Sequence, residues 1–240
     1  MGQGITKLGR QVLTEMLSDT HGPRILPDLK HMSARARQEF YALRDSGDLG
    51  SNDFPLLISH GACNGLKSFD KPEPGDLSTS RQMNPVEINF YDVEIIALAK
   101  SGGLIGLQLD ERRIASRASL KATKRSAFRN KIMHYRSELL WRQVQHIAET
   151  LDREGLFAWD CMAIGSDFDG IIDSLNGFWT AEELPYLADF LERHAHNYLQ
   201  SATWKLSQNR IEADEVIRRI FSGNGHHFLE KHFRTPKGIP

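Results

Sequence analysis

The chain alternates between short apolar runs and amphipathic segments, and this alternation restricts its possible folds more than any other feature of the sequence. Four apolar runs have the length and composition of buried strands, at residues 24–29, 55–59, 104–109 and 161–165. Each run is followed by a segment whose apolar residues recur at helical spacing. Strands that alternate with helices and are apolar on both faces predict a parallel α/β sheet.

Helix ends are marked by residues suited to capping. Thr6 and Ser33 stand where the first two helices would begin, and their side chains are good N-caps. The predicted helices cover about residues 6–17, 33–43, 89–100, 126–153, 181–200 and 212–220, with a last helix from 225. Four strand and helix units equal half of a (β/α)8 barrel, or a small open sheet, and periodicity does not distinguish these two folds.

Residues 61–86 interrupt the alternation. They contain several glycines and prolines and show little periodicity. We interpret them as a long loop over a functional face of a single domain that spans residues 1–240.

Composition excludes several classes of function. The formal net charge is −1, so nothing favours a nucleic-acid partner, and the basic stretch at 112–136 is interpreted as a solvated surface. Two cysteines are too few for a disulfide scaffold. No apolar run approaches the ~20 residues of a membrane helix, and the first residues lack a secretory signal, so we expect a soluble chain. If the chain is part of a longer protein, the whole protein could be exported, and its compartment is not indicated.

Chemically active side chains stand directly after three of the predicted strands. His31 follows the first strand, His60 the second, and Asp167 the fourth. Ligands bind at the carboxyl ends of strands in α/β folds, and imidazole with carboxylate is a good ligand set for zinc. Each residue also has a structural interpretation, as a strand-end cap or as part of a turn, so spacing alone leaves the metal site open.

Several segments together resemble the membrane (renal) dipeptidase family of the amidohydrolase superfamily. The matches run in order from residue 4 to about 230, and the most specific is Ile164 to Gly170, which resembles the IGSDFDG signature. The others are Gly4 to Gly9, resembling GLTxFG; Asp28 to Ser33, resembling D-x-[SAK]-H-x-S; Pro55 to His60, resembling P-[VIL]-x-x-SH; Asn176 to Pro185; and Gly223-Asn224.

The resemblance implies a role for each matched residue. His31 and His60 would be ligands in a site for two zinc ions, and Asp167 would handle the catalytic water or the substrate amine. Arg81, with Asn84 close by, would bind the substrate carboxylate, although the loop before Arg81 is longer than in the family. The implied activity is zinc-dependent hydrolysis of dipeptides or similar small amides.

The chain departs from the family in one large respect. The resemblance implies an HxD metal pair on a first strand and a bridging glutamate on a later one, and neither has a counterpart here. The four strands would be the last four of a barrel, which makes the chain the C-terminal half of a TIM-type (β/α)8 barrel. Such a half exposes strand edges and an apolar face, so we expect it to need an N-terminal half or a second copy of itself.

Two alternatives remain open at this point. The chain could be a non-catalytic barrel fragment that serves as a structural or interaction module, which the missing HxD pair favours. It could also hydrolyse another substrate, such as an ester or lactone, because a fold does not specify a substrate. Among the other histidines, we expect His146 to pack or cap, and His194 and His196 to lie at the surface.

Overall fold

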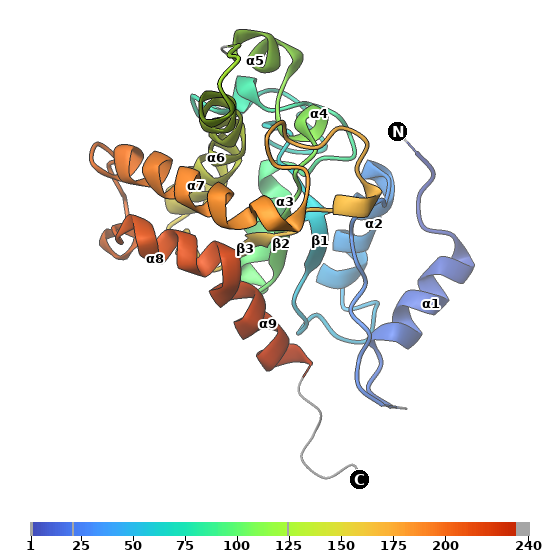
Figure 1. The fold of residues 1–240 in the computed structure, drawn as a ribbon. Helices are drawn as coiled ribbons and strands as arrows, with labels where there is room; N and C mark the ends of the chain where they lie inside the picture. Colours follow the sequence, from blue (N-terminus) through green and yellow to red (C-terminus); the bar gives the residue numbers. More distant parts are fainter. Residues whose placement is uncertain (1, 21, 124, 234–240) are drawn as a thin grey trace.

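A three-stranded parallel sheet forms the centre of the computed structural model, which describes residues 2–20, 22–123 and 125–233. Its strands are β1 (Leu57–Gly61), β2 (Leu104–Leu107) and β3 (Met162–Ile164), paired in that order. Figure 1 shows α1 and α2 on the β1 side of this sheet and α7 to α9 on the β3 side. The prediction of a parallel α/β arrangement is confirmed.

The predicted first strand is wrong in extent. Within residues 24–29, pairing is limited to one parallel bridge between Asp28 and Leu57, supported by the backbone N–H of Leu29 donating to the carbonyl of Leu57 at 2.9 Å. This segment has a neighbour on one side only, and a strand with one partner makes half the ladder hydrogen bonds of a central strand. The other three predicted strands exist, with shifted ends.

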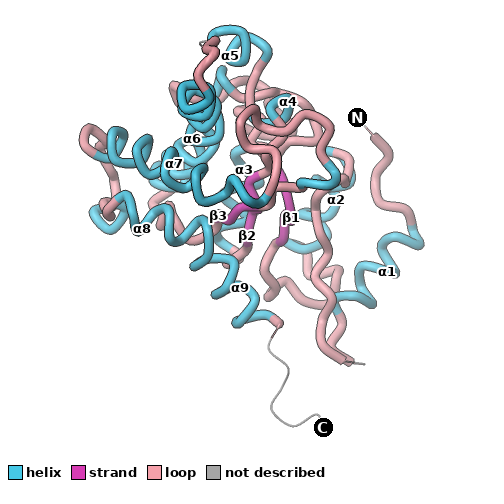
Figure 2. Tube along the Cα trace, viewed as in Figure 1, coloured by secondary structure: helices cyan, strands magenta, loops and turns pink. Residues whose placement is uncertain are grey.

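Helix and loop make up most of the described chain, as Figure 2 shows. The α-helices are α1 (Lys7–Leu17), α2 (Ala34–Asp45), α3 (Asp92–Lys100), α4 (Glu111–Ile114), α5 (Arg117–Ala122), α6 (Arg129–Arg153), α7 (Leu184–Leu199), α8 (Ala213–Arg218) and α9 (Asn224–His232). Shorter turns are the 3₁₀ helices η1 (Ser80–Gln82), η2 (Phe168–Gly170), η3 (Ala181–Glu183) and η4 (Ser207–Asn209), and the π-helix η5 (Arg219–Gly223).

The predicted caps are confirmed by geometry. The Thr6 hydroxyl accepts from the backbone N–H of Gly9 at 3.0 Å, and the Ser33 hydroxyl accepts from that of Ala36 at 3.1 Å. Both bonds satisfy a backbone donor that has no partner inside its helix, so the helices begin where the sequence indicates.

One hydrophobic core joins the sheet to its surrounding helices. Ile58 and Ile105 on the strands and Val144 and Ile147 on α6 are all fully buried within it. Because α6 carries a continuous apolar stripe, it anchors the segment between β2 and β3 against the sheet. None of the helices in the described residues has the length and hydropathy of a membrane span.

The loop predicted at 61–86 is largely irregular in the structure, but it is fixed to the body. Leu66 and Pro74 form an antiparallel bridge across it, and the Thr79 hydroxyl bonds Nδ1 of His146 at 2.9 Å. Nε2 of His146 contacts Asp92 at 2.8 Å, so this histidine packs and bonds inside the protein as predicted. The predicted domain of residues 1–240 includes residues 1, 21, 124 and 234–240, which lie outside the described parts.

The prediction for His194 is wrong. This side chain is 8% exposed, and its Nε2 lies 3.0 Å from the Ser137 hydroxyl. Its ring stacks on that of His134, with centroids 4.8 Å apart. The packing of α7 against α6 buries this face, and the sequence of α7 alone does not reveal it.

Candidate active site

The structure brings His31, His60 and Asp167 together. The rings of His31 and His60 lie 5.0 Å apart between centroids. Nε2 of His60 lies 3.5 Å from Oδ2 of Asp167, without the geometry of a hydrogen bond. His31 and Asp167 follow the carboxyl ends of parallel segments, and His60 lies within β1, beside its last residue Gly61. This end of the sheet is where α/β folds gather ligand-binding groups.

Backbone strain is concentrated at two of these residues. His31 has φ 69° and Asp167 has φ 57°, and no other non-glycine residue in the described segments has a positive φ. This left-handed conformation is uncommon for residues with a side chain, and such strain is often retained at functional sites.

Two glycines allow the strands to approach each other below the site. A Cβ atom placed on Gly106 would lie 2.1 Å from the carbonyl oxygen of Ser59, and one on Gly165 would lie 2.3 Å from the same atom. Neither separation is tolerable for a real side chain. Gly165, the first glycine of the IGSDFDG segment, is therefore required by the close packing of β3 toward β1.

A hydrogen-bonded chain determines which nitrogen of His60 is free. The Ser59 hydroxyl donates its single proton to Asp28, because an ionised carboxylate cannot donate. The same hydroxyl oxygen must then accept from Nδ1 of His60, 2.9 Å away. This assigns the proton of His60 to Nδ1 and leaves a lone pair on Nε2, which has no hydrogen-bond partner although it is buried.

Asp28 is held firmly for this purpose. Its Oδ1 accepts from the backbone N–H groups of Lys30 and Ser59, each at 3.0 Å. A carboxylate that orients the distal nitrogen of a histidine is the usual support for a histidine that ligates a metal. In this protein a serine hydroxyl connects the two groups.

Lys30 adds a buried cation to the site. The residue is 6% exposed, and burial together with the nearby Arg113 lowers the pKa of its ammonium to about 8. Burial also lowers the pKa of His60, and the charge of Lys30 acts in the same direction. Both effects favour a neutral imidazole, which is the form that binds metals.

The side chains fit one divalent cation better than two. The free lone pair of His60 and the adjacent ring of His31 are donors that zinc accepts, and the carboxylate of Asp167 lies beside them. Nevertheless, the described residues contain no cluster of three or more His, Cys, Asp or Glu side chains already arranged around a metal position. In the part of the chain that the structure describes, no carboxylate lies between two such ligand groups.

The two residues predicted to bind the substrate, Arg81 and Asn84, form their contacts apart from the candidate site. Arg81 is exposed in η1, and within the described residues it makes no hydrogen bond or ion pair with His31, His60 or Asp167. Asn84 donates to the carbonyl of Arg112, which places it against α4.

Sequence reasoning missed four residues of the site, namely Asp28, Lys30, Ser59 and Arg113. Asp28 and Lys30 stand in the D-x-K-H segment that resembles the family. Their closeness to His31 in the sequence could therefore have indicated that they belong to the site. Arg113 carries no comparable signal, because its approach to Lys30 depends on how the segment after β2 folds back.

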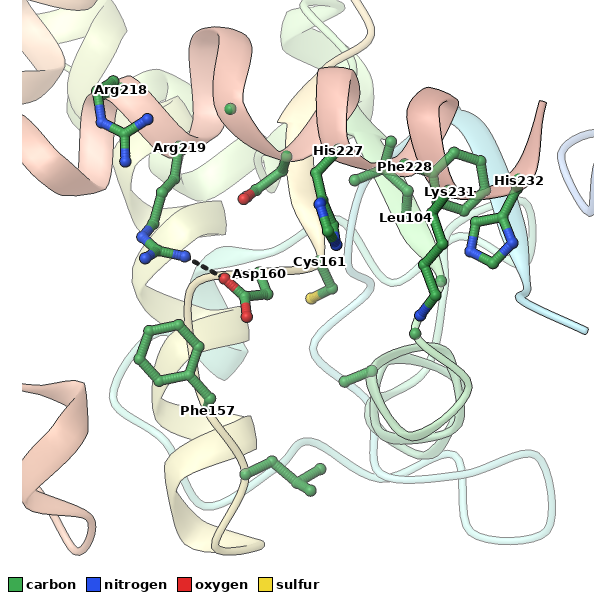
Figure 3. Close-up of a pocket in the computed structure, with 16 residues that line it drawn as sticks. Leu104, Phe157, Asp160, Cys161, Arg218, Arg219, His227, Phe228, Lys231 and His232 are labelled. Carbon is green, nitrogen blue, oxygen red and sulfur yellow. Dashed lines mark hydrogen bonds and ion pairs between the residues drawn. The ribbon is translucent and has the colours of Figure 1, made fainter. Parts of the chain in front are cut away.

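A cavity of about 500 Å³ lies at the opposite end of the sheet, before β2 and β3 begin. Figure 3 shows it between Phe157 and the helix that carries His227 and Lys231, with Arg219 reaching Asp160 at its edge. Burial raises the pKa of the Cys161 thiol in its wall to about 12, so this cysteine is not a nucleophile. Two histidines, His227 and His232, also line this cavity.

Known proteins resemble the chain in structure and not in sequence. No protein-family model matches it, and no curated protein sequence matches it. Among solved structures, a metallopeptidase from Rhodobacter sphaeroides, liganded with a phosphinate mimic of the dipeptide L-Ala-D-Ala, superposes with a TM-score of 0.61 at 19% identity. That match covers 97% of this chain and 48% of the other.

Two further structures agree with this match. The dipeptidase AC, a metallopeptidase of family M19, has a TM-score of 0.61 at 19% identity, covering 97% of this chain and 50% of its own. An amidohydrolase from Pseudomonas aeruginosa has a TM-score of 0.50 at 17% identity, covering 95% of this chain and 57% of its own. The resemblance predicted from the motifs is confirmed at the level of the fold: this chain shares the architecture of M19 metallopeptidases and related amidohydrolases and spans about half of their length.

Proposed function

We propose that this chain is the C-terminal half of a (β/α)8 barrel that hydrolyses dipeptides or similar small amides with zinc. The observation that carries the proposal is the meeting of His31, His60 and Asp167 at the carboxyl end of the sheet, with Nε2 of His60 unpartnered. The fold similarity to dipeptidases and amidohydrolases supports the same reaction class.

Each residue has a distinct part in this proposal. His31 and His60 would bind zinc through neutral imidazole nitrogens, and Ser59 with Asp28 would keep Nε2 of His60 unprotonated. Zinc, when bound, would lower the pKa of a water molecule and polarise the scissile carbonyl. Asp167 would accept the proton of the attacking water and return it to the leaving amine.

Substrate binding rests on Arg81 and Asn84. Arg81 is exposed and forms no ion pair with any described residue, so its guanidinium is available to bind a carboxylate through two hydrogen bonds. Asn84 would orient the same end of the substrate from its position beside α4.

A missing half of the barrel is part of the proposal. Ser59 lies in β1, which pairs with β2 and with Asp28 on its other side, yet Ser59 is exposed. On α1, Leu8 is 68% exposed and Val12 47%, on one face of the helix. An open sheet face and an apolar helix face both favour an N-terminal half, or a second copy, as the missing cover.

The test is zinc content and dipeptide turnover, measured for the chain alone and after an N-terminal half has been supplied. We expect the completed barrel to bind zinc and to hydrolyse L-Ala-D-Ala, with both properties lost in His60→Ala and turnover alone lost in Asp167→Asn. His226→Ala, which changes an exposed histidine, is the matched control. Absence of both zinc and turnover in the completed barrel would contradict the proposal.

A second candidate is a non-catalytic barrel fragment that serves as an interaction module. The absence of a preformed metal cluster in the described residues favours it. Under this hypothesis, alanine at both His31 and His60 would leave partner binding and stability unchanged.

A further inference from the structure

Three arginines line a cavity of about 500 Å³ beside α4 and α5, and the proposed function gives none of them a role. The wall of this cavity includes Asn84, Arg112, Arg113 and Arg117. A cavity of this size accommodates a small ligand. Among the described residues that line it, none is acidic. The basic stretch at 112–136, interpreted from the sequence as a solvated surface, therefore begins with residues that line a cavity.

Carboxylates of the chain neutralise one of the three arginines. Nη2 of Arg112 lies 2.9 Å from Oδ2 of Asp110, and its Nε lies 3.5 Å from Oδ2 of Asp173. Arg113, which is half-buried, and Arg117, which is exposed, take part in none of the ion pairs among the described residues. A guanidinium binds a carboxylate through two parallel hydrogen bonds. The cavity therefore presents two groups that can bind the carboxylates of a ligand.

Hydrogen bonds place this cavity at the same end of the sheet as the candidate site. The backbone N–H of Leu109, just before α4, donates to the carbonyl of Ser166 at 3.4 Å, and Ser166 precedes Asp167. On its other side, α4 is held by the side-chain amide of Asn89, which donates to the carbonyl of Arg113 at 2.7 Å. The helix that carries Arg113 therefore lies beyond the carboxyl end of β2, beside the segment that carries Asp167.

The start of α5 packs against the turn that carries Arg81. The backbone N–H of Ser116 donates to the carbonyl of Gln82 at 2.8 Å, and the Ser119 hydroxyl donates to the same carbonyl at 3.1 Å. Gln82 directly follows Arg81, and Arg117 directly follows Ser116. The arginine proposed above to bind the substrate carboxylate and an arginine of the cavity thus stand on segments that contact each other.

We infer that this cavity binds a second carboxylate of the substrate through Arg113 and Arg117, and that the preferred substrates are dipeptides whose C-terminal residue is aspartate or glutamate. The inference rests on the proposed function, in which Arg81 binds the main-chain carboxylate. A C-terminal aspartate or glutamate carries both carboxylates on one residue. A neutral side chain would leave the two guanidinium groups of the cavity without an anion, so neutral dipeptides should bind more weakly.

The experiment measures the binding of dipeptides to the purified, metal-free chain, so that neither zinc nor turnover enters the result. The two probes, L-Ala-L-Asp and L-Ala-L-Asn, have nearly the same shape and differ in the charge of one side chain. Titrations followed by NMR should show that the wild-type chain binds L-Ala-L-Asp about tenfold or more tightly than L-Ala-L-Asn. Added salt should reduce this difference, because it screens the charges of a partly exposed site.

Two single variants locate the binding site. Arg113→Gln and Arg117→Gln each remove one guanidinium and keep a polar side chain. Each should weaken the binding of L-Ala-L-Asp about tenfold and leave that of L-Ala-L-Asn close to the wild-type value. Arg193→Gln is the matched control, since Arg193 is an exposed arginine on α7 whose guanidinium lies over the ring of Phe190. If circular dichroism shows that a variant does not fold, the comparison of the two dipeptides on the wild-type chain carries the test.

Equal affinities of the wild-type chain for the two dipeptides would overturn the inference, as would wild-type affinity for L-Ala-L-Asp in both arginine variants. A chain that binds neither dipeptide would overturn it as well. All three results would leave the proposed zinc site standing, because the titrations contain no metal. Conversely, a completed barrel without zinc and without turnover would overturn the proposed function even if the metal-free chain prefers the acidic dipeptide.

Discussion

Arg37 and Glu94 form an ion pair at 2.8 Å in which both side chains are fully buried, and the pair joins α2 to α3. Nη2 of Arg37 also donates to the carbonyls of Glu87 and Asn89, each at 3.0 Å. The guanidinium further lies 4.7 Å from the ring centroid of Phe90. These contacts hold residues 87–90, which follow the long loop, against α2.

Loss of the Arg37 charge should therefore destabilise the protein strongly. Arg37→Met leaves the Glu94 carboxylate buried without its ion-pair partner, and we expect a loss of about 3–5 kcal/mol in the free energy of unfolding. Urea denaturation would measure it. The double variant Arg37→Met with Glu94→Met should recover part of the loss, because no buried charge remains. A loss below about 1 kcal/mol in the single variant would show that Glu94 finds another partner or becomes protonated at little cost.

The link from Asp28 through Ser59 to His60 should tune zinc affinity. Ser59→Ala breaks this link while leaving the imidazole in place, so we expect zinc binding to weaken by about 10-fold to 100-fold. Competition with a chelating dye would measure the change. Ser68→Ala, which removes a loop hydroxyl that accepts from the backbone N–H of Lys71, should have no effect on affinity. Equal affinities in Ser59→Ala and the wild-type chain would show that the proton position on His60 is set by another group.

Gly106 and Gly165 should tolerate no side chain. Either glycine changed to alanine would force a methyl group against the Ser59 carbonyl, and we expect losses of about 1–3 kcal/mol or more in the free energy of unfolding. Gly225→Ala is the control, because nothing lies within 4 Å of the added methyl group there. That change in α9 should stabilise by about 0.5–1 kcal/mol. Unchanged stability in Gly106→Ala would mean that β1 and β3 can move apart.

His194 should make stability depend on pH in the acid range. Burial is the main cause that lowers its pKa from 6.5 to about 4, so the folded protein prefers the neutral ring. Between these values the unfolded chain binds the extra proton, and stability falls as the pH falls, by about 3 kcal/mol in total.

The difference between the wild-type chain and His194→Gln isolates this contribution. Stability should decline less steeply from pH 6.5 to pH 4 in the variant, as measured by urea denaturation at several pH values. His196→Gln, which changes a neighbouring histidine bonded to Gln200, should keep the wild-type slope. Parallel curves for the wild-type chain and His194→Gln would contradict the assignment.

Local signals in the sequence were sufficient for much of the fold. Thr6 and Ser33 cap their helices as predicted, because a hydroxyl that accepts from a backbone N–H three residues later acts within one turn. Residues 104–109 and 161–165 were recognised as strands because a short apolar run between helices is a local pattern. The positions of His31, His60 and Asp167 at or just beyond the ends of the predicted strands were enough to predict that they meet, since parallel strands end on one side.

Other features depend on contacts between distant segments, and only the tertiary structure decided them. Residues 24–29 form a single bridge because this segment pairs on one side only. The sequence of a segment does not show which other segments will lie beside it. His194 is buried by α6, which lies far away in sequence. The proton on His60 is assigned by Asp28 and Ser59 together, and the burial of Lys30 becomes visible only in the packed chain. Local hydrogen bonds and periodicity act over a few residues, whereas burial and charge balance are properties of the packed chain.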